Sequence, residues 1–151
     1  MLLRKTFRFE ASHILPKHPG KCSRLHGHSW VLHVEVEGPV NADTGFVMDY
    51  ADISAPWKEF VDHALDHRHL GAWDIPWTGA DLSPNFWLEK NKEWAIPFEY
   101  DTLKYPTSEN ILFWIGEIFQ TFPWSKLALE ETCTSYAELT REEFDATHNK
   151  S

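Results

Sequence analysis

The chain has 151 residues, of which 42% are hydrophobic, 25% charged and 15% aromatic, so the composition predicts one compact domain and argues against a disordered, collagen-like or coiled-coil chain. The formal net charge of -9 argues against nucleic acid or an anionic membrane as the main partner, because phosphate binding requires a basic surface. There is no apolar run of the ~20 residues that a membrane-spanning helix needs, no signal-peptide pattern at Met1–Phe9, and no disulfide framework with only 2 cysteines. We therefore expect a soluble, cytoplasmic protein with a single domain over residues 1–151.

The first two thirds of the chain predict two strands, a helix and an irregular insertion. Apolar and polar residues alternate from Leu3 to His13 and again from His26 to Gly38, which is the period of strands with one buried face. After a turn at residues 41–45, apolar residues at helical spacing from Ile53 to Leu65 predict a helix. Residues 73–105 follow no sustained period, and we interpret them as an insertion that serves as a lid or an oligomer contact.

The last third predicts a helix and two short strands. Thr107 or Ser108 can cap a helix whose apolar stripe covers Ile111–Phe119. Alternating residues at Leu127–Thr132 and Ser135–Leu139 predict the strands, and a polar tail follows them. The complete order is β-β-α-α-β-β.

Three histidines are predicted to lie on one face of the sheet. His26 and His28 are two residues apart in a strand, and His13 can meet them from the neighbouring strand. Three neutral imidazole nitrogens on rigid strands suit zinc, with a fourth position open for water or substrate as in catalytic sites. Ordinary polar histidines at a strand edge are the alternative, but the matching face of His13 favours a metal site.

A cysteine precedes the histidine pair in a basic loop. Cys22 shares this loop with Lys17, Lys21 and Arg24. Nearby positive charge lowers the pKa of a thiol, and the resulting thiolate can act as a base or a nucleophile. The spacing equally allows Cys22 to be a fourth metal ligand or an inert apolar residue. Cys133 stands in an apolar strand context and is expected in the core.

Two carboxylates carry further hypotheses. Asp66 beside His67 can hold the tautomer of the imidazole and raise its basicity, as in a proton shuttle, although a solvated helix end is the alternative. Glu131 is expected on the apolar face of its strand with Leu127 and Leu129, where a carboxylate needs a partner. The two parallel N–H donors of a guanine or pterin ring would satisfy it in a bidentate manner, and an ion pair with Arg or Lys is the alternative.

Six segments resemble motifs of the 6-pyruvoyl- and 6-carboxy-tetrahydropterin synthase superfamily, in family order. They are Phe7–His13, Cys22–His28, Gly45–Tyr50, Leu65–His67, Pro106–Asn110 and Glu131–Thr132. The resemblance implies an α+β tunnelling fold (T-fold), with a four-stranded antiparallel sheet and two helices on one face. It also implies subunits that join edge to edge into barrels, usually as a hexamer of two stacked trimers, and closing the barrel removes exposed sheet edges.

The resemblance also implies residue roles and a reaction. Zn2+ is held by His13, His26 and His28, Cys22 is the catalytic thiol, Asp66 with His67 forms the relay, Glu131 anchors the pterin, and Thr107, Ser108 and Glu109 line its pocket. The three-residue spacer between Cys22 and His26 is similar to that of the 6-carboxy-tetrahydropterin synthases of the queuosine (7-deazaguanine) pathway. Such a lyase converts 7,8-dihydroneopterin triphosphate to 6-carboxy-5,6,7,8-tetrahydropterin, acetaldehyde and triphosphate.

Two departures from the family pattern leave other hypotheses open. Gly71 stands where the family commonly has Asn, and the insertion at residues 73–105 is longer than in compact members. A 6-pyruvoyl-tetrahydropterin synthase or a related pterin side-chain lyase is the second hypothesis. From another class, the chain is a non-catalytic binding module stabilised by zinc, in which Cys22 ligates the metal and Glu131 pairs with a protein cation.

Overall fold

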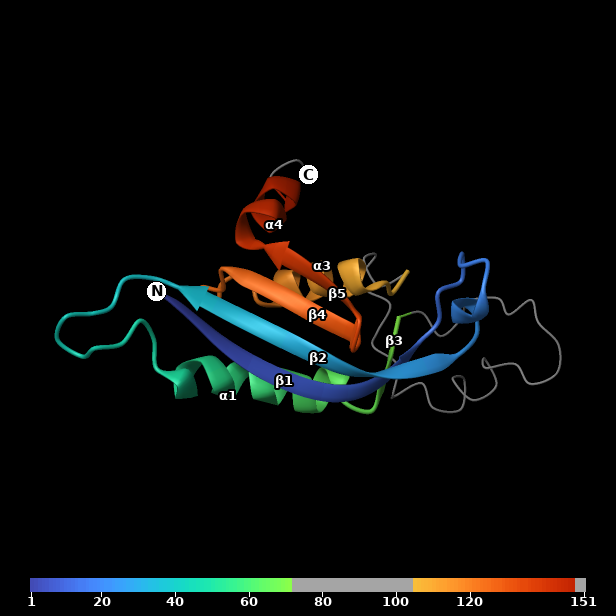
Figure 1. Cartoon of the computed structure of the whole chain (residues 1–151), viewed down its shortest axis with the longest axis horizontal. Helices are drawn as coiled ribbons and strands as arrows, with labels where there is room; N and C mark the ends of the chain where they lie inside the picture. Colours follow the sequence, from blue (N-terminus) through green and yellow to red (C-terminus); the bar gives the residue numbers. More distant parts are fainter. Residues whose placement is uncertain (72–104, 149–151) are drawn as a thin grey trace.

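The structure, a computed structural model, describes residues 1–71 and 105–148 and is built around one five-stranded sheet (Figure 1). Its elements in chain order are β1 (Leu2–His13), η1 (Lys21–Ser23), β2 (His26–Glu37), α1 (Tyr50–Phe60), η2 (Val61–Leu65), β3 (Arg68–Leu70), α3 (Ser108–Ile118), β4 (Lys126–Thr132), β5 (Ser135–Thr140) and α4 (Arg141–His148). The strands follow the order β3-β1-β2-β4-β5 across the sheet. The expected insertion at residues 73–105 lies outside the described residues, apart from Tyr105.

The expected α+β architecture is confirmed, with one strand more than the resemblance implied. The antiparallel core of the sheet is β1, β2, β4 and β5, and β3 adds a short strand that runs parallel to β1. The sheet is therefore mixed rather than purely antiparallel. Three paired residues show no readable period, which is why the sequence pattern did not predict β3.

The chain after β5 was expected to be a polar tail without secondary structure, but residues 141–148 form the helix α4. Thr140 and Glu143 make a capping box at its start: the Thr140 backbone N–H and hydroxyl donate to the Glu143 carboxylate at 2.9 and 2.7 Å, and the Glu143 N–H donates to Thr140 Oγ1 at 3.2 Å. The ring of Phe144 is buried against α3, where a side chain on Gly116 would approach that ring to 2.9 Å. The capping box and one apolar residue thus dock the short helix.

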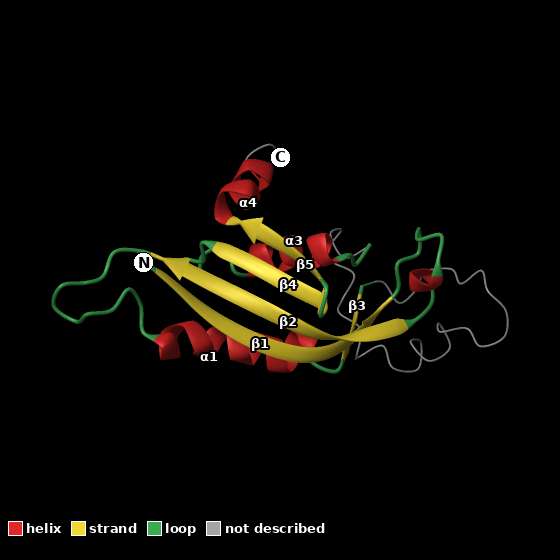
Figure 2. Ribbon diagram, viewed as in Figure 1, coloured by secondary structure: helices red, strands yellow, loops and turns green. Residues whose placement is uncertain are grey.

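The main helices α1 and α3 cover the same face of the sheet (Figure 2). Their apolar stripes and the inward side chains of the strands form the core, whose fully buried members include Trp30, Leu32, Val34, Ile53, Trp57, Leu65, Ile111, Leu112, Ile115, Leu127 and Leu129. Burying each such side chain contributes about 1.5–3 kcal/mol. The first helix begins at Tyr50, three residues before the first apolar residue of the predicted helix, and contains Pro56. No helix within residues 1–71 and 105–148 is long and apolar enough to span a membrane.

The pairing of β1 with β2 sets the histidines on the helix-covered face. His13 lies opposite His26, Ala11 opposite His28, and Phe9 opposite Trp30. Because side chains alternate between the faces of a strand, all of these residues point to the same side as the core. The sheet therefore carries a row of imidazoles at the end of its apolar face.

Candidate active site

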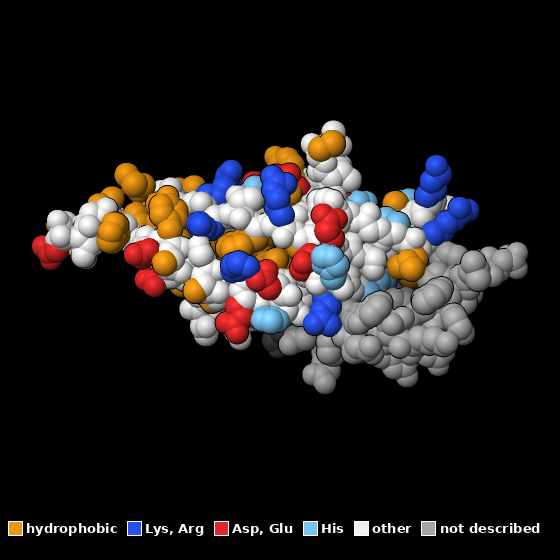
Figure 3. All heavy atoms as spheres, turned by 90° about the horizontal axis from the view of Figure 1, so that it is seen from below, with side chains coloured by type: hydrophobic (Ala, Val, Ile, Leu, Met, Phe, Trp, Pro, Cys, Tyr) orange, Lys and Arg blue, Asp and Glu red, His pale blue; other side chains and the backbone are white. Residues whose placement is uncertain are grey.

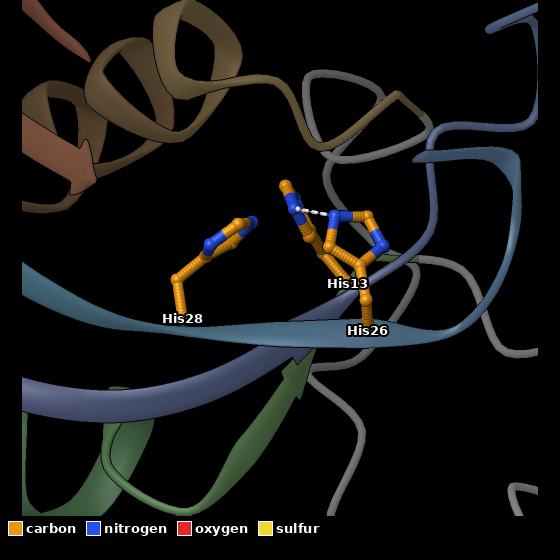
Figure 4. Close-up of side chains that lie close together, drawn as sticks. All are labelled: His13, His26 and His28. Atoms are coloured by element: carbon orange, nitrogen blue, oxygen red, sulfur yellow. Dashed lines mark hydrogen bonds between the residues drawn. The ribbon is translucent and has the colours of Figure 1, made fainter. Parts of the chain in front are cut away.

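Three histidines converge at the end of β1 and the beginning of β2, as the sequence predicted (Figure 4). Their ligating nitrogens all lie within 4.8 Å of one another, and the group contains no cysteine. His13 is fully buried, whereas His26 and His28 are half-buried. Three imidazole nitrogens this close together could be held by one zinc ion, which binds each nitrogen at ~2.0–2.1 Å.

Main-chain carbonyls orient two of the three rings. His13 Nδ1 donates to the carbonyl of Pro106 at 2.9 Å, and His26 Nδ1 donates to the carbonyl of Arg24 at 2.7 Å. Since a carbonyl only accepts, each Nδ1 carries a proton, which leaves Nε2 as the nitrogen that can present a lone pair to a metal ion. The two Nε2 atoms face each other at 3.0 Å, an arrangement that a cation between them would stabilise.

The electrostatics of the group also suit a metal ion. Burial, together with repulsion from the neighbouring histidines, lowers the pKa of His13 from 6.5 to about 4, despite the opposing hydrogen bond to Pro106. Burial likewise lowers the pKa of His28. His28 Nε2 is buried and makes no hydrogen bond to the described part of the chain. The lowered pKa values of His13 and His28 favour uncharged imidazoles, and neutral imidazole nitrogens are donors that zinc binds.

Glu131 lies beside this group, on the side of His13 and His28. Its Oε1 is 3.3 Å from His13 Nε2 and 3.4 Å from His28 Nε2, and its side chain is 26% exposed. The last β2–β4 pair is Val31 with Glu130, and the β4–β5 register shifts between Glu130 and Thr132. The neighbours of the Glu131 carboxylate are thus the imidazoles of His13 and His28. No Arg or Lys within residues 1–71 and 105–148 forms an ion pair with it.

A cavity of about 430 Å³ opens between the start of β2 and the end of β4. Its lining includes the site residues His28 and Glu131 together with Arg8 and Glu130. Cys133 also lines it, from the turn between β4 and β5, and is exposed rather than in the core as expected. The expectation was wrong because the turn begins at that residue, so the strand pattern no longer applies.

The Pro106–Asn110 segment reaches the site through its backbone. The Pro106 carbonyl holds His13, and Thr107 caps α3 by accepting the Asn110 N–H at 3.3 Å. The Asn110 side chain donates to the carbonyl of Tyr105 at 2.7 Å. Thr107 and Ser108 are half-buried here and Glu109 is exposed, and their expected contact with a pterin stays a prediction.

Asp66 and His67 form a pair, but the pair stands apart from the three histidines. His67 Nδ1 is 2.9 Å from Asp66 Oδ2, and Asp66 Oδ1 accepts the backbone N–H of Glu10 at 2.9 Å. That backbone N–H, and to a smaller degree His67, holds the pKa of Asp66 below its usual range. His67 has a φ of +57° and a side chain that is 79% exposed. The Asp66–His67 pair thus lies at the β1–β3 edge of the sheet with the His67 ring turned to solvent, and its role as a proton relay stays a prediction.

Cys22 lies in η1, within the loop that joins β1 to β2. It is half-buried, and its carbonyl accepts the Leu15 N–H at 2.9 Å, which closes the loop. The group of His13, His26 and His28 that could bind a metal, here called the metal group, contains no cysteine. The structure therefore gives no support to Cys22 as a fourth ligand. Its role as the catalytic thiol stays a prediction.

Sequence reasoning missed the groups that orient the ligands. Trp30 packs edge-on against His13 and His28, with ring centroids 5.1 and 5.3 Å apart, and its Nε1–H donates to the Ala11 carbonyl at 3.1 Å. Its position two residues after His28, on the same strand face, was a readable signal. The carbonyls of Pro106 and Arg24 had no signal, because every residue has a carbonyl.

Comparison with known proteins identifies curated relatives of two kinds. The chain is 42% identical over 73 residues to the 6-carboxy-5,6,7,8-tetrahydropterin synthase of Synechocystis, covering 46% of this chain and 57% of that one. It is 32% identical to a putative enzyme of the same name from Pyrococcus horikoshii, covering 89% and 87%. Human 6-pyruvoyl tetrahydrobiopterin synthase is 30% identical over 65% of this chain and 72% of its own. The matches to the Synechocystis and Haemophilus influenzae enzymes span about half the length of those relatives.

Solved structures share the fold. An uncharacterized protein of Wolinella succinogenes aligns with a TM-score of 0.70 and 22% identity over 93% of this chain and 98% of that one. The 6-pyruvoyl tetrahydropterin synthase of Caenorhabditis elegans aligns with a TM-score of 0.67 and 22% identity over 93% and 94%. These likenesses confirm the tunnelling fold, and the family model for 6-pyruvoyl tetrahydropterin synthase matches residues 2–142. With motifs, fold and family model in agreement, this chain belongs to the 6-pyruvoyl tetrahydropterin synthase family.

Proposed function

We propose that the chain is a zinc-dependent lyase that converts 7,8-dihydroneopterin triphosphate to 6-carboxy-5,6,7,8-tetrahydropterin, acetaldehyde and triphosphate in 7-deazaguanine (queuosine) biosynthesis. The observation that carries the proposal is the group of His13, His26 and His28, with Glu131 at 3.3–3.4 Å from two of its nitrogens beside a cavity of about 430 Å³. Relatives that bear the 6-carboxy-tetrahydropterin synthase name support this product.

The residues divide the work by their chemistry. The three imidazoles hold zinc, which would polarise the hydroxyls of the substrate side chain and make them and the adjacent C–H bonds more acidic. Glu131 accepts two parallel N–H bonds from the pterin ring and thereby fixes its orientation. Cys22 and His67 move protons, and Asp66 holds the His67 ring in the required tautomer.

The position of the relay favours an assembly of several copies. His67 is exposed at the β1–β3 edge, whereas the ring of His13 is fully buried beside His26, His28 and Trp30. The sheet ends in β3 on one side and β5 on the other, and joining such edges into a barrel would pair their free backbone groups. In the proposed hexamer of two stacked trimers, the Asp66–His67 pair of one copy serves the histidine group of a neighbour.

Product analysis tests the reaction directly. Zinc-loaded protein is incubated with 7,8-dihydroneopterin triphosphate under anaerobic conditions, and the products are identified by mass spectrometry. We expect 6-carboxy-5,6,7,8-tetrahydropterin together with acetaldehyde. If 6-pyruvoyl-tetrahydropterin forms without acetaldehyde, the chain belongs to the pyruvoyl branch. If nothing is converted although zinc and pterin both bind, the chain is a binding module and the proposal is wrong.

A further inference from the structure

The distribution of charge along the chain singles out the segment that carries the histidines. The chain has 23 Asp and Glu residues and a net charge of -9, yet none of these acids falls between Ala11 and Val34. The same segment contains Lys17, Lys21 and Arg24. The site that the acidic chain builds is therefore locally basic on one side.

The three cations sit on a loop with a defined backbone. Besides the Leu15–Cys22 bond that closes the loop, Ser23 donates twice to the carbonyl of Gly20, through its N–H at 3.2 Å and its hydroxyl at 2.8 Å. Lys17 Nζ lies 4.3 Å from the centre of the Tyr105 ring, next to the residue that orients His13. Lys and Arg side chains gather at this end of the molecule, with histidine beside them (Figure 3).

Lys21 and Arg24 have exposed side chains that form no ion pair with any acid in residues 1–71 and 105–148. By contrast, Lys58 on α1 pairs with Asp62, and Lys126 with Glu138 at 3.2 Å. Unpaired cations in an acidic protein are available to a ligand with negative charge.

The site has a polar order from one end to the other. Glu131 contacts His13 and His28, these lie beside His26, and His26 Nδ1 is held by Arg24. Along the site, a carboxylate is therefore followed by the three histidines and then by the cations. A pterin triphosphate has the same order, with N–H donors on the ring, hydroxyls on the side chain and phosphates at its end. Two carboxylates, Glu130 and Glu131, line the cavity end of the site against one cation, Arg8, so phosphates would meet net negative charge there.

We propose that Arg24 and Lys21, with Lys17 at the rim, form the subsite that binds the triphosphate group of the substrate. Arg24 then has two tasks, because its carbonyl orients a metal ligand and its guanidinium binds phosphate oxygens in a bidentate manner. The backbone distance from Arg24 to His26 is at most about 7 Å, which places the guanidinium within reach of a phosphate attached one carbon beyond the hydroxyls. This assignment rests on the proposed function for the identity of the substrate.

The test compares two fluorescent ligands, neopterin and neopterin triphosphate, in equilibrium titrations of the zinc-loaded protein. The dissociation constant of neopterin divided by that of neopterin triphosphate measures how much the phosphates add to binding. In Arg24→Ala and Lys21→Ala we expect that ratio to fall about tenfold each, while neopterin affinity and zinc content stay at the level of the unmodified protein. Lys58→Ala removes a lysine charge on α1 and should leave the ratio unchanged, and Arg24→Lys should recover part of the loss.

An unchanged ratio in the Lys21→Ala/Arg24→Ala double variant would overturn the subsite. Equal loss of neopterin and neopterin triphosphate binding would also overturn it, because the loop would then be acting on the pterin or the metal. Turnover of 7,8-dihydroneopterin triphosphate by the unmodified protein tests the proposed function separately. If turnover is absent but the ratio still depends on Arg24, the phosphate subsite stands and the proposed reaction fails.

Discussion

Mixing two inactive variants tests whether the Asp66–His67 pair serves a neighbouring copy. Cys22→Ala leaves the relay intact, and His67→Ala leaves the loop thiol and the metal group intact. The structure places Cys22 in the loop that leads into β2, and His67 at the opposite side of β1 with 79% of its side chain exposed. We therefore expect each variant to be inactive by itself and the mixed oligomer to regain activity.

The magnitude follows from counting subunits. If each site takes its thiol from one copy and its relay from another, random mixing in equal amounts makes about one quarter of the sites fully intact. Turnover of 7,8-dihydroneopterin triphosphate should thus return to about a quarter of the unmodified level, following ~10³-fold losses in the separate variants. Native mass spectrometry confirms that mixed oligomers have formed. Mixed oligomers that remain inactive would refute the shared site, since a relay within one copy leaves every site with a defect.

Four further predictions address separate groups of the site. His28→Ala should lose most of the zinc measured by elemental analysis, whereas His33→Ala, on the other face of β2, should keep it. Cys22→Ala should keep full zinc content, and zinc loss would favour a closed structural site. Glu131→Gln should weaken pterin binding about tenfold or more in a fluorescence titration with an unchanged melting temperature, because an amide presents one acceptor oxygen; an unaltered affinity would make Glu131 a structural carboxylate. The lowered pKa of Asp66 stabilises the fold above the ordinary pKa of an aspartate, so the melting-temperature advantage over Asp66→Asn should shrink from about pH 5 to pH 3, and a constant difference would contradict it.

Periodic features of the fold were readable from the sequence. The strands at Leu2–His13 and His26–Glu37 agree with the predicted alternation to within a residue at their ends, and their pairing brings His13, His26 and His28 together. Thr107 caps α3 as one of the two expected candidates. These features were predictable because alternation and capping are local and repeat along the chain.

Features without a local pattern were not predicted. The three residues of β3 pair with β1 only because the π-helical turn η2 ends at Leu65 and turns the chain back toward Glu10. Asp66 and His67 could be named as a pair from the sequence, but their place at the sheet edge depends on that turn. The α4 helix is a different case, since Thr140 and Glu143 have the spacing of a capping box and the signal was overlooked.

The metal group depends on main-chain atoms, and this determines which substitutions can disturb it. His13 is fixed by the carbonyl of Pro106, which precedes the cap of α3, and His26 by the carbonyl of Arg24, which ends the basic loop. Replacing the Arg24 side chain leaves its carbonyl in place, so phosphate binding can change without loss of the metal. A displacement of the start of α3 would instead move the acceptor of His13 and with it the Nε2 that faces His26. The proposed site would therefore separate phosphate recognition, which the loop side chains can vary, from metal binding, which follows the backbone of the sheet and the helix start.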